Sequence, residues 1–283
     1  MDSNIIAVRQ RVHGAAELPV AVVIPLYNEE RIITEKLEAI AGILDVLVGS
    51  GNWHFVLVEN GSTDGTPRLV EEATGRWPPS YAVNLSEPNY GAALKAGLCS
   101  VKCKWAYLLD IEQWDPPFIT WAWKNRRSFD LFIASKRADP TINNQALYRK
   151  LLSCGLNGVL QFLTHFTGTD THGNKLIDCE SLRSIIDVCQ LDRGQFDTEL
   201  VLRACRAQKR IVEVPVEYRE YRPQRNWMLK KIIWNVRALR RLQRVMADVP
   251  FEGSLRYYRF AREDLLAESE TEVPAAEREY GIV

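Results

Sequence analysis

The chain lacks the sequence features of several common protein classes. Its six cysteines include no CxxC pair and it has only four histidines, so a zinc framework is not expected. No apolar run reaches the roughly 18 residues that span a bilayer, and the N-terminal stretch 1–14 has no signal-peptide core. The 36 basic and 36 acidic residues cancel, which argues against an overall polycation. These absences predict a cytoplasmic protein with reduced thiols that does not cross a membrane by itself.

Two phosphate-binding motifs are also missing. There is no G-x-G-x-x-G after the first apolar run and no G-x-x-x-x-G-K-[ST] anywhere. Neither a dinucleotide-binding site nor a P-loop is therefore expected, and a bound phosphate would need another partner.

The chain does contain short apolar runs that alternate with helical patterns. Five runs are typical of buried strands: 20–26, 54–60, 81–87, 105–111 and 130–137. Asn28 can cap a helix after the first run. The apolar residues of that helix step by four and three: Ile33, Leu37, Ile40, Leu44 and Leu47. This alternation predicts an α/β fold with a mostly parallel sheet.

Polar segments follow each of the five runs. They are PLYNEE, ENGSTDGT, EPNYGAALKAG, DIEQWD and SKRADP. Turn chemistry could explain any one of them. Because ligands of parallel sheets bind at the carboxyl ends of the strands, the five together predict a ligand site at that edge.

The fourth of these segments is the most acidic. Asp110, Glu112 and Asp115 lie within six positions, at the end of a buried strand. Asp110 and Glu112 flank Ile111, which is turned into the core, and both can reach a hard cation such as Mg²⁺ or Mn²⁺. The cation could in turn hold a diphosphate. Solubility at a loop is the simpler alternative.

Several motifs in this order resemble a family 2 glycosyltransferase with the GT-A fold. They are VVIPLYNEE, VLVENGSTDGT, NYGAALKAG, LLDIEQWDPP and IASKR, and the resemblance covers about residues 19–225. Further on, DTHGNK (170–175) and FDTELVLRACRAQKRIVEVPV (196–216) resemble dolichol-phosphate mannose synthase and its bacterial polyprenyl-phosphate relatives. The resemblance implies a Rossmann-like, mostly parallel sheet flanked by helices, a nucleotide-diphosphate sugar as donor, and a divalent metal, Mg²⁺ or Mn²⁺.

The resemblance also implies roles for individual residues on the donor side. The nucleotide-sugar-binding residues would be Pro25, Tyr27, Glu29, Glu59, Asn60, Gly91 and Lys95. Glu59 and Asn60 stand where the family usually has two aspartates that recognise the base and the ribose.

The same resemblance assigns the metal and the chemistry. Asp110 and Glu112 match the DxD motif, with Glu in the second place, and are implied to be catalytic metal ligands. Trp114 stands where mannose synthases often have a glutamine, so Gln113 or Asp115 could supply a third ligand.

Further residues are implied on the catalytic and acceptor sides. Arg137 matches a basic residue near the phosphates, and Glu199 matches an acidic position for which an ion pair with Arg203 is the alternative. The acceptor-side residues are Asp170, His172, Arg222 and Arg225. A structural role is the alternative for the histidine.

A basic amphipathic pattern follows the last of these motifs. Nine basic residues and one acid lie between Arg219 and Arg244, and the apolar positions from Leu229 onward share one helix face. Such a helix, with Trp227 and Trp234, is typical of a membrane surface. The alternative is a helix packed on the protein's own core with a solvated basic back. No nucleic-acid-binding module is present, so nucleic acid is not an expected partner.

We therefore expect four segments and one main function. The segments are an N-terminal extension (1–18), a GT-A glycosyltransferase domain (19–225), a basic amphipathic helix (226–250) and an acidic flexible tail (251–283). The expected reaction is inverting, metal-dependent transfer of a sugar to a polyprenyl phosphate. It would take place peripherally at the inner face of a membrane, with an anionic surface or a membrane protein as partner. A soluble glycosyltransferase acting on a hydroxyl and a non-catalytic nucleotide-sugar-binding protein remain alternatives.

Overall fold

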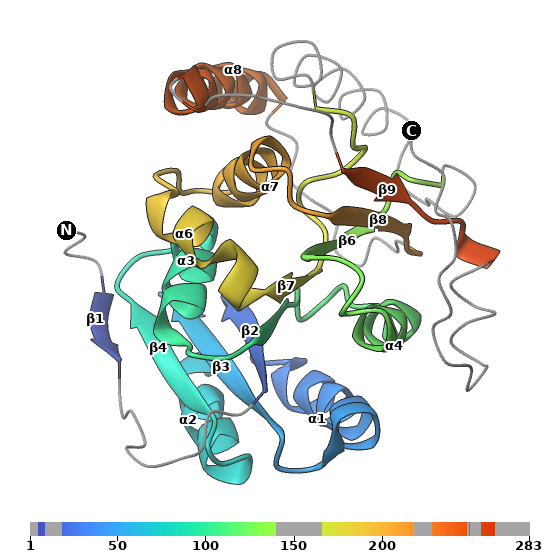
Figure 1. Cartoon of the computed structure of the whole chain (residues 1–283). Coiled ribbons are helices and arrows are strands. Elements are labelled where there is room, and N and C mark those ends of the chain that lie inside the picture. Colours follow the sequence, from blue (N-terminus) through green and yellow to red (C-terminus); the bar gives the residue numbers. More distant parts are fainter. Residues whose placement is uncertain are drawn as a thin grey trace.

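The centre of the structure is one mixed sheet with helices on both faces (Figure 1). The computed structural model describes residues 5–8, 19–139, 166–217, 228–247, 249 and 256–263, with only the backbone for 5–8 and 228–237. The described strands form a nine-stranded sheet in the order β1-β4-β3-β2-β5-β7-β6-β8-β9. Their bounds are β1 Ile5–Val8, β2 Val20–Leu26, β3 Trp53–Asn60, β4 Tyr81–Leu85, β5 Trp105–Leu108, β6 Leu131–Ser135, β7 Lys175–Asp178, β8 Ile211–Pro215 and β9 Tyr257–Arg259.

All five strands predicted from the apolar runs are present, as β2 to β6. Strand β2 is buried along its whole length, as a continuous apolar run requires, and it pairs in parallel with β3 and β5. The pattern did not reveal β7, which runs antiparallel between β5 and β6. The prediction of a mostly parallel α/β sheet is confirmed, with β7 and the β1–β4 pair as antiparallel exceptions.

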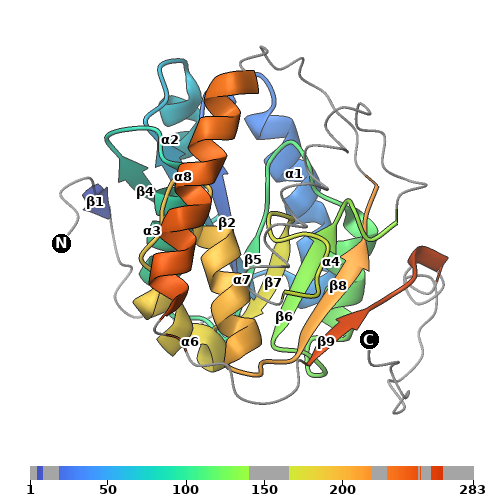
Figure 2. The ribbon, with the colours of Figure 1, turned by 90° about the horizontal axis from the view of Figure 1, so that it is seen from above.

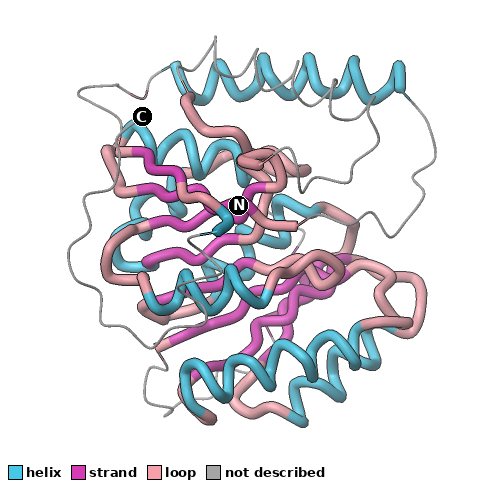
Figure 3. The backbone as a smooth tube through the Cα atoms, turned by 90° about the vertical axis from the view of Figure 1, so that its right-hand side faces the viewer, coloured by secondary structure: helices cyan, strands magenta, loops and turns pink. Residues whose placement is uncertain are grey.

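Helices cover the sheet in two layers, which Figure 3 shows from the side. On one face lie α1 (Ile33–Leu44), α2 (Thr66–Arg76) and α4 (Pro116–Lys124), which share a buried cluster with Ile24 and Phe132. On the other face lie α3 (Tyr90–Ser100), α6 (Cys179–Val188) and α7 (Phe196–Arg206). This layering leaves the loops after the strand ends as the place where chemistry can be built.

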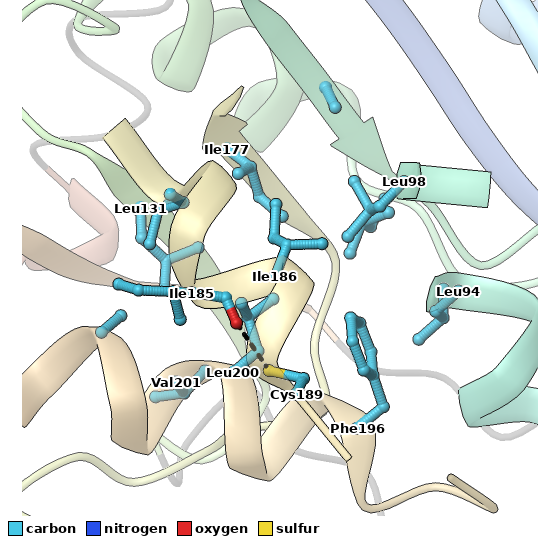
Figure 4. Close-up of a cluster of buried hydrophobic side chains, with 14 of the residues drawn as sticks. Leu94, Leu98, Leu131, Ile177, Ile185, Ile186, Cys189, Phe196, Leu200 and Val201 are labelled. Atoms are coloured by element: carbon cyan, nitrogen blue, oxygen red, sulfur yellow. Dashed lines mark hydrogen bonds between the residues drawn. The ribbon is translucent and has the colours of Figure 1, made fainter. Parts of the chain in front are cut away.

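The second layer is held by a continuous apolar cluster, part of which Figure 4 shows. Leu94 and Leu98 of α3, Ile186 of α6, and Phe196 and Leu200 of α7 meet there, each at most 2% exposed. The cluster fixes α3, α6 and α7 relative to one another, and so fixes the loops at their ends.

The first helix begins later than the sequence suggested. Helix α1 starts at Ile33, and Asn28 does not cap it. Asn28 has a positive φ of 57° and its side-chain oxygen accepts a hydrogen bond from the Thr63 N–H at 2.8 Å. The capping prediction is therefore wrong, because Asn28 is used to join two loops instead.

Helix α8 (Met228–Ala247) confirms the predicted helical extension and lies outside α7 (Figures 1 and 2). Leu242 and Met246 are 3% and 2% exposed and belong to the same buried cluster as α6 and α7. Arg240, Arg241 and Arg244 are exposed. In its last ten residues the helix therefore follows the alternative interpretation, in which the apolar face packs on the core and the basic face meets solvent.

The sheet also enters the segment that the sequence assigned to a flexible tail. Strand β9 pairs in parallel with β8, and Tyr257 is 3% exposed, so residues 257–259 belong to the folded domain. The other predicted segment boundaries stay predictions. Within the described part of the chain, no helix has the length and apolarity that crossing a bilayer requires.

Candidate active site

The first two strand-end loops are joined to each other at the carboxyl edge of the sheet. The Glu29 N–H donates to the Thr66 hydroxyl at 2.8 Å, next to the bond between Asn28 and Thr63. Of the predicted nucleotide-binding residues, Pro25 lies buried within β2, Glu29 is 8% exposed and Tyr27 is 42% exposed. Tyr27 is thus a ring on the surface of this edge that a planar group could stack on.

Glu59 and Asn60 end β3 and are both buried. The Glu59 carboxylate accepts hydrogen bonds from the Gly61 and Ser62 N–H groups at 3.2 and 2.7 Å. The Asn60 side-chain oxygen accepts from the Asn89 N–H at 2.8 Å. Both side chains hold neighbouring loops, so any contact with a base or ribose would use their remaining polar sites.

Gly91 and Lys95 face the loop between α6 and α7. A Cβ at Gly91 would lie 2.8 Å from the Asp192 carbonyl carbon, so only glycine permits this close approach. The Lys95 ammonium donates to the Cys189 carbonyl at 2.6 Å. This contact ties α3 to the end of α6, and the predicted role of Lys95 over a nucleotide stays a prediction.

Asp110 and Glu112 follow β5 closely, as predicted. Asp110 accepts from the Glu112 N–H through Oδ1 at 2.8 Å, and its own N–H donates to Asn174 at 2.8 Å. Burial and the negative charge of Glu112 raise the pKa of Asp110. A divalent cation would relieve this unfavourable pairing, and two hard carboxylate donors suit Mg²⁺ or Mn²⁺. The residues therefore fit the implied metal.

Both carboxylate oxygens of Asp115 have partners in the structure. Its Oδ1 accepts from the Phe118 N–H and caps α4, while Oδ2 accepts from Arg262 at 2.8 Å. Among the described residues, no three His, Cys, Asp or Glu side chains are grouped so that they could hold a metal ion. The structure thus gives Asp115 a capping role instead, and the suggestion that Asp115 or Gln113 is the third ligand stays a prediction. Substrate phosphates commonly complete such a coordination shell.

Two basic residues, Lys136 and Arg137, follow β6 directly. The Arg137 Nη1 donates to the Thr169 carbonyl at 3.2 Å, whereas its buried Nε has no hydrogen-bond partner in the described part of the structure. Lys136 acts electrostatically on both Asp110 and Asp170. An anion could therefore be held beside the carboxylate pair.

Asp170 is buried within this group, as its position in the DTHGNK motif suggested. It is 1% exposed, and its Oδ2 makes no hydrogen bond to any described residue. Burial would raise the pKa of Asp170, but Lys136, Arg137 and His172 lower it more, so its pKa lies below the usual value. The carboxylate therefore remains charged, and its buried Oδ2 is an acceptor without a partner among the described residues.

Two predicted residues have structural contacts instead. His172 donates through Nε2 to the Gly194 carbonyl at 2.8 Å. Glu199 is fully buried, receives two N–H groups from Gln190 and Leu191, and pairs with Arg203 at 2.7 Å. Since both Glu199 oxygens are occupied, the catalytic assignment of Glu199 is not supported and the alternative ion pair is observed. Arg222 and Arg225 lie outside the described residues.

A second buried group at this edge was missed from the sequence. Lys175 and Asp197 form an ion pair of 2.7 Å with side chains 1% and 2% exposed. The second Asp197 oxygen has no partner among the described residues. The pKa of Tyr90 is raised, mainly because its hydroxyl is buried and further by the negative charges of Asp197 and Asp110. The residue as a whole is 37% exposed, so its ring reaches the surface while its hydroxyl does not. Tyr90 is therefore close enough to both Asp197 and Asp110 to be affected by their charges.

A cavity of about 610 Å³ lies elsewhere, at the amino edge of the sheet. Its lining includes Pro19, Cys103, Lys104 and Arg183, which precede β2 and β5 or belong to α6. None of the predicted site residues lines it, so it is separate from the candidate active site.

Comparisons with known proteins agree with this arrangement. Residues 21–117 match the sequence model of glycosyl transferase family 2. A dolichyl-phosphate beta-glucosyltransferase of Trichomonas vaginalis is 26% identical over 216 residues, covering 72% of this chain and 67% of the relative. An undecaprenyl-phosphate 4-deoxy-4-formamido-L-arabinose transferase of Edwardsiella ictaluri is 26% identical, covering 71% of this chain and 60% of the relative. The chain thus spans about two thirds or less of the length of these relatives.

A solved structure shares the fold. Glucosyl-3-phosphoglycerate synthase of Mycobacterium tuberculosis, in complex with Mg²⁺ and uridine diphosphate, matches with a TM-score of 0.54 and 18% identity, over 83% of this chain and 80% of that one. The family match covers β2 to the start of α4, which includes Glu59 and the Asp110–Glu112 pair. Residues 21–117 therefore resemble glycosyl transferase family 2, and the chain shares its fold with this solved glycosyltransferase.

Proposed function

We propose that this domain transfers a sugar, with inversion, from a nucleoside-diphosphate sugar to a polyprenyl phosphate. The observation that carries the proposal is that Asp110 and Glu112 lie together after β5, where Lys136, next to Arg137 in the loop after β6, acts electrostatically on Asp110. Two carboxylates are suited to a divalent cation, and two basic residues are suited to phosphate oxygens. A diphosphate with its cation matches both halves of this site.

The residues of this site would bind the cation and the phosphates and would orient the donor sugar. Asp110 and Glu112 would hold the cation, which when bound stabilises the negative charge that develops on the departing nucleoside diphosphate. Asn174 fixes the loop by accepting from the Asp110 N–H and donating to the Gln113 carbonyl at 2.5 Å. Arg137, whose Nε donates to no group in the described part of the chain, would hold a phosphate oxygen of the donor or the acceptor.

The donor proposal predicts an effect at Glu59. Glu59→Ala removes the acceptor for two loop N–H groups, so the loop that should face the nucleotide loses its anchor. We expect uridine diphosphate with Mn²⁺ to bind roughly 5- to 150-fold more weakly, which corresponds to about 1–3 kcal/mol. Isothermal titration calorimetry measures this, with Glu59→Gln as a control that keeps one acceptor oxygen. Equal affinity of wild type and Glu59→Ala would place the base elsewhere.

The relatives and the charges favour a lipid phosphate as acceptor. Two of the similar proteins are named for transfer to dolichyl or undecaprenyl phosphate. A phosphate acceptor is already ionised and needs no general base, only cationic guidance of the kind that Lys136 and Arg137 offer.

A hydroxyl acceptor is the second candidate, and one observation favours it. Asp170 and Asp197 each have a buried oxygen without a partner in the described structure, and either could accept a proton from an attacking hydroxyl. Partitioning of labelled product between water and organic solvent distinguishes the two. Hydrolysis of the donor in the absence of acceptor would exclude the third candidate, a non-catalytic nucleotide-sugar-binding protein.

Helix α8 is proposed to meet the anionic surface that carries the lipid. Leu242 and Met246 are buried against the core and are not free to insert into a bilayer. In this part of the helix, binding to an anionic membrane should therefore come mainly from the charges of the exposed Arg240 and Arg244. Each arginine contributes on the order of 1 kcal/mol near an anionic bilayer. Arg240→Gln/Arg244→Gln should therefore weaken binding to phosphatidylserine vesicles by roughly 10- to 30-fold at low salt.

Sedimentation with vesicles measures this binding, and neutral phosphatidylcholine vesicles are the control. The wild-type protein should lose most of this affinity at high salt, where the Debye length falls to about 3 Å. Equal sedimentation of the double variant and the wild type would contradict a role for this face of α8.

A further inference from the structure

One carboxylate joins the start of α3 to α8. Asp192 lies in the loop between α6 and α7, and its Oδ2 accepts from the Asn89 side-chain amide at 3.1 Å. Its Oδ1 accepts from Arg241 of α8 at 3.2 Å. Asp192 therefore contacts both the segment before Tyr90 and the helix that forms the outer layer.

Asn89 is the centre of a wider set of contacts. Its side-chain oxygen accepts from the Ala92 N–H at 3.2 Å, which caps α3, and from the Arg193 N–H at 2.8 Å. Its main-chain N–H donates to Asn60 at 2.8 Å. Together with the close approach at Gly91, these bonds fix residues 89–91 between the end of β3 and the loop that contains Asp192.

The fixed segment faces the proposed chemistry. Tyr90 follows Asn89 directly and acts electrostatically with Asp110, the first predicted metal ligand. Asn60 ends the strand where the nucleotide is proposed to lie. Misplacement of a donor-site group by about 1 Å can cost on the order of 100-fold in rate, so a residue that holds Asn89 can affect binding without touching the substrate.

We propose that Asp192 is a positioning residue of the donor site, which it holds in place through Asn89 and connects to α8 through Arg241. This inference rests on the proposed function. The hydrogen bond of Asp192 with Asn89 and its ion pair with Arg241 should differ in strength. The side chains of Arg241 and Asp192 are 57% and 35% exposed, and an ion pair with that exposure contributes little. Most of the effect should therefore pass through Asn89.

Three variants separate these contributions. Asp192→Ala removes both contacts. Asp192→Asn keeps an oxygen that can accept from Asn89 but removes the charge that attracts Arg241, and Arg241→Gln removes only the ion pair. Asp187→Ala is the matched control, because it is an exposed aspartate of α6 that lines the cavity at the opposite edge.

The experiment combines hydrogen exchange without ligand, the Kd of uridine diphosphate with Mn²⁺, and donor kinetics. Asp192→Ala should speed amide exchange in residues 89–93, raise the Kd and the donor KM about 5- to 10-fold, and change the acceptor KM little. Asp192→Asn should restore most of the affinity, and Arg241→Gln and Asp187→Ala should stay within about twofold of wild type.

The outcomes distinguish this inference from the proposed function. Faster exchange at residues 89–93 with a raised Kd supports the inference. Unchanged exchange and Kd in Asp192→Ala would overturn it, as would equal loss in Asp192→Asn, because a purely charge-based or general structural effect would then be at work. If wild type binds no nucleoside diphosphate, the proposed function fails, and changed exchange would still support the contact through Asn89.

Discussion

Asp110→Asn should abolish sugar transfer, with an expected loss of at least about 100- to 1000-fold in kcat. The amide has the same shape and can still accept from the Glu112 N–H, so the loop should keep its conformation. The charge that a cation would need is lost. Because burial and Glu112 already disfavour the charged form of Asp110, the melting temperature should stay the same or rise.

Activity assays and thermal unfolding of the same preparations check this. Asp130→Asn is the matched control. Asp130 precedes β6, at the edge of the sheet away from the candidate site, and pairs with Arg210 at 2.9 Å. That control should lose some stability and keep its activity. Glu112→Gln should also be strongly impaired. Full activity of Asp110→Asn in the presence of EDTA would contradict the assignment of this site.

Lys175→Met should cause the largest loss of stability, about 3–5 kcal/mol in the free energy of unfolding. In the ion pair, the side chains of Lys175 and Asp197 are 1% and 2% exposed. The change therefore leaves the Asp197 carboxylate buried without its partner. The corresponding fall in melting temperature is roughly 6–20 °C for a domain of this size. Denaturant unfolding followed by circular dichroism measures the difference.

The double variant Lys175→Met/Asp197→Leu is the control for this prediction. It removes both charges, so most of the stability should return, since a buried pair can often be replaced by apolar residues at small cost. Equal loss in the single and double variants would show that packing, rather than the stranded carboxylate, sets the cost.

The sequence predicted the parts of the site that depend on local pattern. Each buried run ended in polar residues, and the rule for parallel strands placed Glu59 and Asp110 at one edge, where the structure has them. The role of Asp115 could also have been read locally, because an aspartate before two prolines and an apolar run is a helix N-terminus signal.

The rest depends on contacts between distant positions. Asn89 and Asp192 are 103 residues apart, and Lys175 and Asp197 are brought together by β7, a strand too short to stand out as an apolar run. The amphipathic pattern of α8 could not say which surface its apolar face meets. The structure decides this for Leu242 and Met246, which pack on the core.

Transfer of labelled sugar into an organic phase tests the central claim most directly. The full chain is incubated with a labelled uridine-diphosphate hexose and other nucleotide-sugars in turn, with Mn²⁺ or Mg²⁺, and with a short polyprenyl phosphate. The account predicts label in the organic phase that requires both the polyprenyl phosphate and the cation and that is absent with Asp110→Asn. Label that stays in the aqueous phase on a hydroxyl acceptor, or transfer that persists unchanged in EDTA, would contradict it.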